Sequence, residues 1–185
     1  MRGDSLKRMV TAYIGLGGNV SSVAGPPEKT LAAAVARLGA VGRVVARSGL
    51  YSTAPVGYAE QPRFVNAVVG LETSLDAGAL LKKLLEIERE FGRDRSAGVP
   101  NGPRTLDLDL LLYDERVLNE AGLVVPHPRL AERAFVLVPL REIAPDVVVP
   151  GWNRSVKELL ESLRQNAAQD ADAVIAIDSD FWIGA

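Results

Sequence analysis

The sequence contains no cysteine and only one histidine among its 185 residues. The lack of cysteine excludes disulfides, thiolate nucleophiles and zinc–cysteine sites, and it fits a reducing cytoplasm. A metal site with several histidine ligands is also excluded, because only His127 is available. No apolar run approaches the length of a membrane span, and residues 1–9 lack the apolar core of a signal peptide. We therefore expect a cytoplasmic protein with no membrane partner.

Neither sign of charge is in large excess, since 21 basic and 23 acidic residues give a formal net charge of −2. Nucleic-acid-binding proteins usually carry a basic excess, and RNA-binding strands need clustered aromatic residues. Aromatic residues make up only 5% of this chain, so no nucleic-acid partner is expected. The length suffices for one hydrophobic core. We predict a single domain, with a core over about residues 10–150 and a C-terminal helix and tail over 151–185.

Hydrophobic periodicity predicts alternating strands and helices in the first part of the chain. We expect strands at residues 10–16, 41–52, 64–73 and 104–112. We expect helices from Pro26 to Gly39 and from an N-cap at Asp76 to Phe91. The resulting order is typical of the ferredoxin-like βαββαβ core, an α+β fold with helices on one face of an antiparallel sheet. C-terminal additions follow: a helical region through Ile143, a capped helix from Ser155 and a strand at 173–177.

The most informative stretch of the chain is residues 104–112, with the sequence RTLDLDLLL. Its alternation predicts a strand with Asp107 and Asp109 on one face and leucines on the other. Two strand residues on one face are roughly 6.5–7 Å apart, where unpaired carboxylates repel each other and are costly to bury. Positive charge is therefore expected beside them, either as arginines on a solvated strand face or as a pair of hard cations.

The residues around the aspartates favour the cations. Arg93, Arg95 and Arg104 lie within one short stretch, and arginine binds phosphate oxygens bidentately. Magnesium takes one or two carboxylates and leaves its other positions to water and phosphate. The sequence has no Walker A motif, and residues 15–20 lack the last glycine of a Gly-x-Gly-x-x-Gly loop. Side chains and metal ions would therefore hold a bound polyphosphate.

Two further residues are candidates for ligand contacts. His127 lies between Pro126 and Pro128 in a stiff segment, where it suits a phosphate donor and a surface loop equally well. Asn66 stands among the apolar residues of the strand at 64–73. A buried amide needs a hydrogen-bond partner, and a bound heterocycle could supply it.

Several of these segments occur together in a characteristic order. They are LYSTAPVG at 50–57, QPRFVNA at 61–67, Glu88 with FGR at 91–93, GPRTLDLD at 102–109, PHP at 126–128 and RAF at 133–135. Their order and spacing resemble the hydroxymethyl-dihydropterin pyrophosphokinase family of folate biosynthesis, over about residues 13–146. The resemblance implies transfer of the β,γ-diphosphate of ATP to the hydroxymethyl group of a reduced pterin, with release of AMP.

The resemblance also implies which residues act on ATP. Asp107 and Asp109 would hold two Mg²⁺ ions on the triphosphate, and these aspartates would act in catalysis together with Arg93 and Arg104. The ATP molecule would be bound by Arg95, Arg104, Leu110, His127 and Arg133. ATP and hydroxymethyl-dihydropterin would be the partners of a protein that is a monomer or a weak homodimer.

The pterin would be bound by Thr53, Val56, Phe64, Asn66 and Phe135. Its ring would stack between the two phenylalanines, and the loops at 53–63 and 93–103 would close over both substrates. The chain departs from the family pattern at three positions. Asn101 stands where an aromatic residue is common and Ala54 where proline is common. Gly18 stands where serine is common, in a turn where we expect either residue to fit.

Three other functions remain open on the sequence alone. The aspartate pair could serve a nucleotidyl or phosphoryl transferase that acts on another acceptor. A non-catalytic nucleotide- or pterin-binding domain could keep the same fold without turnover. The third is a ferredoxin-like RNA-binding module, which the acidic balance of the chain disfavours.

Overall fold

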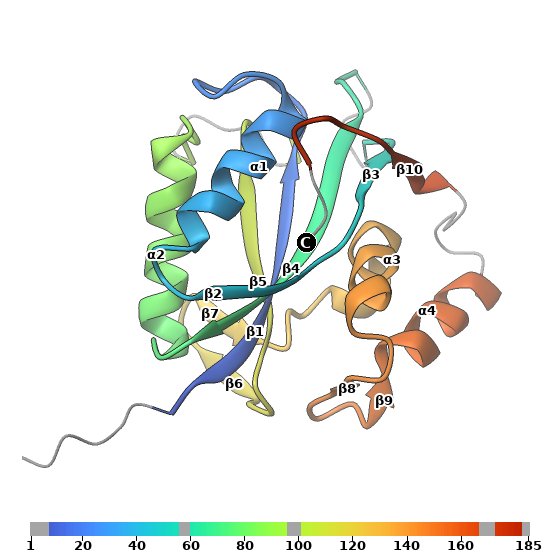
Figure 1. Cartoon of the computed structure of the whole chain (residues 1–185). Helices are drawn as coiled ribbons and strands as arrows, with labels where there is room; N and C mark the ends of the chain where they lie inside the picture. Colours follow the sequence, from blue (N-terminus) through green and yellow to red (C-terminus); the bar gives the residue numbers. More distant parts are fainter. Residues whose placement is uncertain (1–7, 56–59, 96–100, 167–172, 183–185) are drawn as a thin grey trace, which may run out of the picture.

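The computed structural model describes residues 8–55, 60–95, 101–166 and 173–182. It combines helices with antiparallel sheet, as the sequence predicts (Figure 1). The strands are β1 (Val10–Gly18), β2 (Arg43–Arg47), β3 (Leu50–Thr53), β4 (Phe64–Thr73), β5 (Asp107–Tyr113), β6 (Leu118–Glu120), β7 (Leu123–Val125), β8 (Val148–Val149), β9 (Arg154–Ser155) and β10 (Ile175–Ile177). The helices are α1 (Pro27–Leu38), α2 (Ala77–Glu90), α3 (Ala134–Ile143), α4 (Val156–Gln165) and a 3-10 turn at Leu130–Glu132. No helix in these ranges is long and apolar enough to cross a membrane.

The main sheet has the strand order β10-β3-β4-β1-β5, and β2 also pairs with β4. All of these pairings are antiparallel. The central strands β1 and β4 pair from Val10 opposite Thr73 to Gly18 opposite Val65. The start of β5 therefore lies beside the end of β1, because Asp107 pairs with Gly17.

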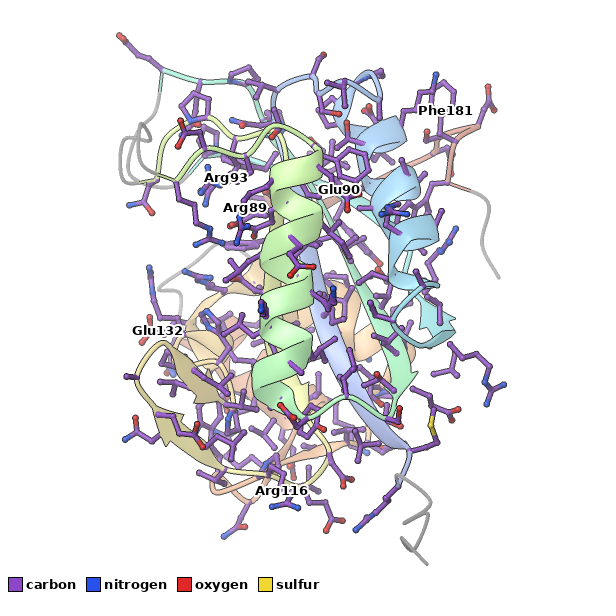
Figure 2. The ribbon with its side chains drawn as sticks, turned by 90° about the vertical axis from the view of Figure 1, so that its left-hand side faces the viewer. Arg89, Glu90, Arg93, Arg116, Glu132 and Phe181 are labelled. Atoms are coloured by element: carbon purple, nitrogen blue, oxygen red, sulfur yellow. The ribbon has the colours of Figure 1, made fainter. Side chains whose placement is uncertain are left out.

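Helices cover both faces of the main sheet: the two helices of the predicted core lie on one face, as expected, and the C-terminal helices cover the other. On one face, α1 and α2 pack over a core that includes Ile14, Leu71 and Leu108. On the other face, α3 and α4 share a second core with Val68 and Leu111. Figure 2 is turned so that α2 lies in front of the sheet and these later helices lie behind it. The second layer arises because the C-terminal helices have apolar stripes of their own to bury.

Local signals in the sequence account for the residues at which two helices begin. Asp76 is the predicted N-cap of α2, and its carboxylate accepts a hydrogen bond from the Ala79 N–H at 2.8 Å. Ser155 and Glu158 form the predicted capping box at the start of α4. Both predictions are confirmed because capping depends on residues three positions apart and not on the rest of the fold.

Several strand predictions need correction. β5 begins at Asp107 and not at Arg104, and the hairpin β6–β7 has no counterpart in the sequence prediction. The predicted strand at 41–52 is divided into β2 and β3. The division falls at Ser48, whose hydroxyl accepts the Val68 N–H at 2.9 Å and thereby takes the place of a backbone acceptor.

The sheet face toward α3 carries a hollow beside β1. Gly15 and Gly17 lie on this face, and Gly17 pairs with Asn66 of β4 on one side and Asp107 of β5 on the other. A β-carbon added to Gly17 would lie 2.9 Å from Asn66 Oδ1. The absence of side chains at these two positions therefore leaves space between β4 and β5.

Gly18 belongs to β1 and not to the turn that the sequence predicts. A β-carbon added there would lie 2.5 Å from the backbone carbonyl oxygen of Thr105. The expectation that serine and glycine fit equally well at this position is therefore wrong for this backbone.

Candidate active site

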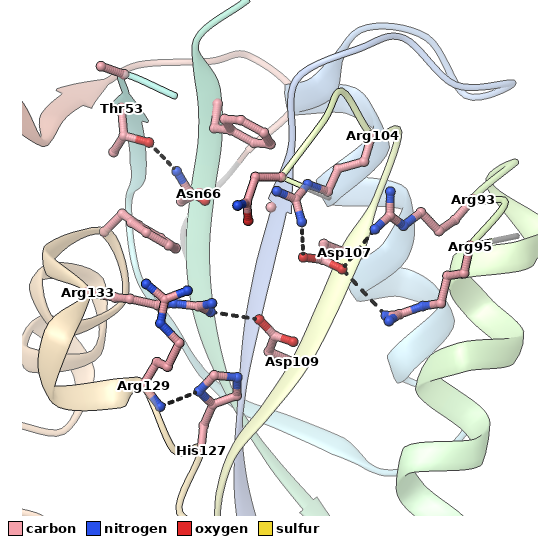
Figure 3. A pocket seen from close by; sticks show the side chains of 15 residues that line it. Thr53, Asn66, Arg93, Arg95, Arg104, Asp107, Asp109, His127, Arg129 and Arg133 are labelled. Atoms are coloured by element: carbon pink, nitrogen blue, oxygen red, sulfur yellow. Dashed lines mark hydrogen bonds and ion pairs between the residues drawn. The ribbon is translucent and has the colours of Figure 1, made fainter. Parts of the chain in front are cut away.

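A cavity of about 250 Å³ opens over the hollow beside β1 (Figure 3). Its walls come from β3, β4, β5, the segment after α2, the residues just before β5, the His127 segment and the start of α3. The lining residues are Gly17, Thr53, Ala54, Phe64, Asn66, Arg93, Arg95, Asn101, Arg104, Asp107, Asp109, His127, Arg129, Arg133 and Phe135. Segments that are far apart in the sequence thus form the cavity, which has one polar end and one partly aromatic end.

Asp107 and Asp109 project together from β5 into this cavity, while Leu108 and Leu110 between and beyond them are buried in the core. The predicted alternation is therefore confirmed. Asp107 lies 2.9 Å from Arg104 Nη1 and 3.5 Å from Arg95 Nη2. These pairs match the arginine partners that the sequence offered as one way to offset the two negative charges.

Arginines outnumber acids in the cavity wall. Among the described residues, five arginines and two aspartates line it, so the positive charges of this part of the wall exceed the negative charges by three. Arg93 lies 3.8 Å from Asp107 Oδ1, and Arg133 lies 3.6 Å from Asp109 Oδ2. The Nε atoms of Arg93 and Arg104 are buried and have no hydrogen-bond partner among the described residues. The excess positive charge of this wall suits a multiply charged anion.

The surroundings of Asp109 disfavour its charged form. Burial, with a further contribution from the nearby Asp107 charge, raises the pKa of the Asp109 carboxyl to about 6. Arg133 acts in the opposite direction but does not offset both effects. A cation beside the two carboxylates would relieve this cost, because an opposite charge favours the ionised form.

His127 is held against β5 by its backbone, whose N–H donates to the Leu111 carbonyl at 2.9 Å. Its ring Nδ1 accepts a hydrogen bond from the Arg129 N–H at 3.2 Å. Burial and the charges of Arg133 and Arg129 lower the pKa of the imidazole to about 4. A neutral ring whose Nδ1 is an acceptor carries its proton on Nε2, so Nε2 is a donor available to a ligand.

We therefore expect His127 to stay neutral at pH 7, with its proton on Nε2. Because it is the only histidine, its ring signals in a ¹⁵N-correlated NMR spectrum need no assignment. These signals should change little between pH 8 and about 5.5 and should titrate near pH 4, since the folded protein disfavours the imidazolium. A midpoint near the ordinary value of about 6.5 would contradict the charge arrangement described for this ring.

The other end of the cavity combines an amide with two aromatic rings. Asn66 Nδ2 donates to Thr53 Oγ1 at 2.8 Å, and both residues are buried. The Arg104 guanidinium lies 5.0 Å from the Phe64 ring centroid, and the Arg133 guanidinium lies 5.6 Å from that of Phe135. This end can stack a flat heterocycle and bind its polar edge, while the arginines bridge it to the charged end.

Glu88 of α2 links the charged end to the helix layer. Its side chain is 1% exposed, and Oε1 accepts the Leu108 N–H of β5 at 2.8 Å. The same carboxylate accepts Arg95 Nε at 2.9 Å and Nη2 at 2.8 Å. Glu88 thereby binds the Leu108 N–H on the outer edge of β5 and holds Arg95 beside Asp107.

Most of the residues expected from the sequence to form a site lie together in the cavity. They are Thr53, Phe64, Asn66, Arg93, Arg95, Arg104, Asp107, Asp109, His127, Arg133 and Phe135. Val56 lies outside the described residues. Leu110 does not line the cavity, because its side chain is buried in the core between the sheet and α1 and α2.

The structure adds residues that the sequence did not single out for a site. Arg129 lines the cavity, and the only sequence signal was its place directly after the Pro-His-Pro segment. Asn19, which directly follows β1, donates to Gln61 Oε1 at 2.9 Å and to the Pro62 carbonyl at 3.0 Å. Its Oδ1 accepts the Arg104 N–H at 2.9 Å. Asn19 thus ties together the ends of the two loops beside the cavity.

Comparisons with known proteins find a matching family model and several similar proteins. The family model described as 7,8-dihydro-6-hydroxymethylpterin-pyrophosphokinase (HPPK) matches residues 13–145. A protein of Methylorubrum extorquens named 2-amino-4-hydroxy-6-hydroxymethyldihydropteridine pyrophosphokinase is 45% identical over 157 residues, which cover 84% of this chain and 94% of the relative. The protein of the same name from Pseudomonas aeruginosa is 47% identical over 150 residues, covering 80% of this chain and 88% of the relative.

A solved structure shares the fold. The crystal structure of a Plasmodium falciparum HPPK-DHPS triple mutant with SDX-DHP aligns with a TM-score of 0.70 at 14% identity. The alignment covers 91% of this chain and 47% of that chain, so this chain spans about half the length of the larger protein. At this level of identity the likeness supports the fold alone.

Proposed function

Because the chain belongs to the 7,8-dihydro-6-hydroxymethylpterin-pyrophosphokinase family, we propose that its cavity transfers the β,γ-diphosphate of ATP to the hydroxymethyl group of a reduced pterin. The pterin hydroxyl oxygen attacks the β-phosphorus of ATP, the bond to the α-phosphate oxygen breaks, and AMP leaves. The observation that carries the proposal is the pair Asp107 and Asp109 directed into an arginine-rich cavity, with an amide and two aromatic rings at the other end.

The arginines and His127 suit the triphosphate of ATP. Arg93 and Arg104 line the cavity beside Asp107, and we assign them to the oxygens of the moving diphosphate, where charge builds up in the transition state. Arg95, His127 and Arg133 would bind the other phosphate oxygens. Their donors are fixed before the ligand arrives, which lowers the cost of reorganisation during the reaction.

The ATP contact that we expect from Leu110 would be made by its backbone. Its side chain is in the core, but β5 is the last strand on its side of the main sheet. The groups on its outer edge do not pair with another strand of that sheet, and the Leu108 N–H on this edge is already taken by Glu88. We assign the Leu110 backbone groups to the nucleotide at this edge.

The other end of the cavity suits the pterin. Phe64 and Phe135 would stack on its two faces, and Asn66 would bind its amide edge together with Thr53. The Asn66 amide is already oriented by its hydrogen bond to Thr53 Oγ1, so its Oδ1 remains for the ligand. Val56 would add backbone contacts to the same edge.

The two aspartates fit the Mg²⁺ ions that the family uses with ATP. Magnesium is bound by one or two carboxylates together with water and substrate phosphates. The described residues hold no group of three or more His, Cys, Asp or Glu side chains that could bind a metal, so Asp107 and Asp109 would share the ions with the triphosphate. When bound, the ions would neutralise phosphate charge and make the β-phosphorus more electrophilic.

The raised pKa of Asp109 predicts a pH dependence of this binding. The carboxyl binds a proton below about pH 6, and a metal ligand must be deprotonated. The affinity for Mg²⁺ with a non-hydrolysable ATP analogue should therefore rise with pH through about 6 and level off above about 7. Calorimetry in buffers of different ionisation enthalpy would measure the released proton. The variant Asp109→Asn should release only the proton of the nucleotide itself, and equal release in both proteins would contradict the assignment.

Product analysis tests the proposed function directly. Wild-type protein with ATP, Mg²⁺ and hydroxymethyl-dihydropterin should form AMP and the pterin diphosphate in equal amounts. ADP would indicate a phosphoryl transferase, and free pyrophosphate would indicate a nucleotidyl transferase. Binding of both ligands without any turnover would point to the non-catalytic alternative.

We also infer the setting of this activity. The strand order β3-β4-β1-β5 with the connections through α1 and α2 supports a ferredoxin-like core. The matched relatives are covered over most of their length, which supports a single catalytic domain.

An enzyme that consumes ATP and a reduced pterin would act in the cytoplasm. We propose a monomer or weak homodimer, which sedimentation analysis would test.

A further inference from the structure

The last described segment of the chain, residues 173–182, lies outside the stretch that matches the family model. Its strand β10 pairs antiparallel with β3, with Ile175 opposite Ser52 and Ile177 opposite Leu50. The segment then passes from β10 toward α1 (Figure 1). It therefore covers the outer side of β3, which without it would be an edge of the sheet.

Trp182 anchors the end of this segment. Its side chain is 8% exposed and belongs to the core on the α1 side of the sheet. The indole N–H donates to the Ser48 carbonyl at 2.7 Å, and the Arg47 guanidinium lies 4.8 Å from the ring centroid. Ser48 is where β2 gives way to β3, and its backbone N–H and hydroxyl both bond to the Val68 backbone. Trp182 thus holds the junction at which β3 begins.

Arg63 forms a second link, at the other end of β3. Its Nε donates to Ser52 Oγ at 2.8 Å, and its Nη2 donates to the carbonyls of Ser52 at 3.2 Å and Ala173 at 3.4 Å. Ser52 directly precedes Thr53, and Arg63 directly precedes Phe64. The C-terminal segment is therefore tied to both chain segments that enter the aromatic end of the cavity.

β3 depends on this support because it is short. It pairs with β4 at only three positions, and strands with few buried contacts open locally at low cost in free energy. Thr53, its last residue, accepts the Asn66 amide hydrogen bond at 2.8 Å. If β3 shifts, the pair that forms the polar wall of this end loses its geometry.

We infer that β10 and its anchor Trp182 act as positioning residues for the pterin end of the cavity. They hold β3 so that Thr53 orients Asn66 for the heterocycle. The inference rests on the proposed function, which makes this end the pterin site. The aspartates stand on β5, which β4 and β1 separate from β3 in the sheet. The effect should therefore fall on the pterin and spare the nucleotide.

Three variants of the full chain test this inference. Trp182→Ala should raise the Kd of the reduced pterin about 10-fold and leave that of a Mg²⁺-bound ATP analogue nearly unchanged. The substitution removes the support of β3, and β3 positions the groups that bind the pterin but not those that bind the nucleotide. Trp182→Phe keeps an aromatic ring in the core but lacks the N–H donor to Ser48, so its effect should be smaller. Phe181→Ala is the matched control. Phe181 is 50% exposed and lies over Lys29, so both affinities should equal those of the wild type.

Hydrogen–deuterium exchange of the β3 amides, measured without ligands, should be faster in Trp182→Ala than in the wild type and the Phe181→Ala control. Unchanged exchange, unchanged pterin affinity or an equal loss of both affinities would overturn the inference. If the alanine variant does not fold, the β3 exchange and the two affinities are compared between Trp182→Phe and the wild type instead. A wild-type protein that binds nucleotide but no pterin would refute the proposed function, and β3 exchange would still decide whether the C-terminal segment holds β3.

Discussion

Replacing Asp107 with alanine is expected to lower kcat by about 10³-fold or more. The carboxylate is one of two that would hold the metal ions, and metal ions supply several kcal/mol of charge stabilisation to phosphoryl transfer, at about 1.4 kcal/mol for each factor of ten in rate. Asp107 also gathers Arg93, Arg95 and Arg104, which lie 3.8, 3.5 and 2.9 Å from its oxygens. Its loss would therefore remove a charge partner of these arginines as well as a ligand of the ions.

The measurement is AMP formation at saturating ATP, Mg²⁺ and reduced pterin, with circular dichroism to show that the variant is folded. Asp146→Ala is a suitable control, because Asp146 is an aspartate on the surface, paired with Lys157 and 79% exposed. It should keep wild-type turnover. Near-normal turnover of folded Asp107→Ala would refute the role of the aspartate pair.

Binding without magnesium separates this electrostatic account from simple damage to the site. In Asp107→Ala five arginines would face a single aspartate. The metal-free ATP analogue should therefore bind the variant at least as tightly as the wild type, while the gain in affinity on adding Mg²⁺ should be lost. Weaker binding of the metal-free analogue would indicate a disrupted cavity.

Replacing Glu88 with leucine should lower the free energy of unfolding by about 2–3 kcal/mol, more than any other substitution proposed for this protein. Removing one partner of a fully buried ion pair costs about 3–5 kcal/mol, but Arg95 is 52% exposed and can regain water. The remaining cost is the buried Leu108 N–H, which now donates to the Glu88 carboxylate at 2.8 Å and would have no acceptor. Urea unfolding measures the difference.

Glu88→Gln provides the matched comparison. It keeps an acceptor for the Leu108 N–H but loses the charge that holds Arg95, so it should cost about 1 kcal/mol and still weaken ATP binding. Glu90→Gln, on the same helix, removes a bidentate pair with Arg37 that is exposed on both sides and should change stability little. Equal losses from Glu88→Leu and Glu88→Gln would show that the backbone contact to β5 does not matter.

Features that depend on neighbours in the sequence were predictable. The alternation of residues 104–112 placed Asp107 and Asp109 on one face of a strand, because strand geometry alone fixes that relation. The caps at Asp76 and Ser155 follow from residues three positions apart. Family resemblance then indicated which distant side chains belong to the site, and the cavity contains nearly all of them.

Features that depend on packing between distant segments were not predictable. The division of the strand at 41–52 follows from bonds between Ser48 and Val68, and the second helical layer follows from apolar stripes that need a sheet face to cover. Gly18 looked replaceable in sequence, but its β-carbon position is occupied by the Thr105 carbonyl. None of these partners lies near in the sequence, so no local pattern reports them.

The sequence by itself determined the chemistry of this protein, because the aspartate pair, the arginines and the lone histidine set what a site could bind. Only the tertiary structure decided how that chemistry is assembled. The glycine hollow on β1, the buried Glu88 tether and the C-terminal segment over β3 exist only once the sheet has brought separate strands together. The physical reason is range: side-chain charge and strand alternation are local properties, whereas burial and charge pairing depend on which distant atoms meet.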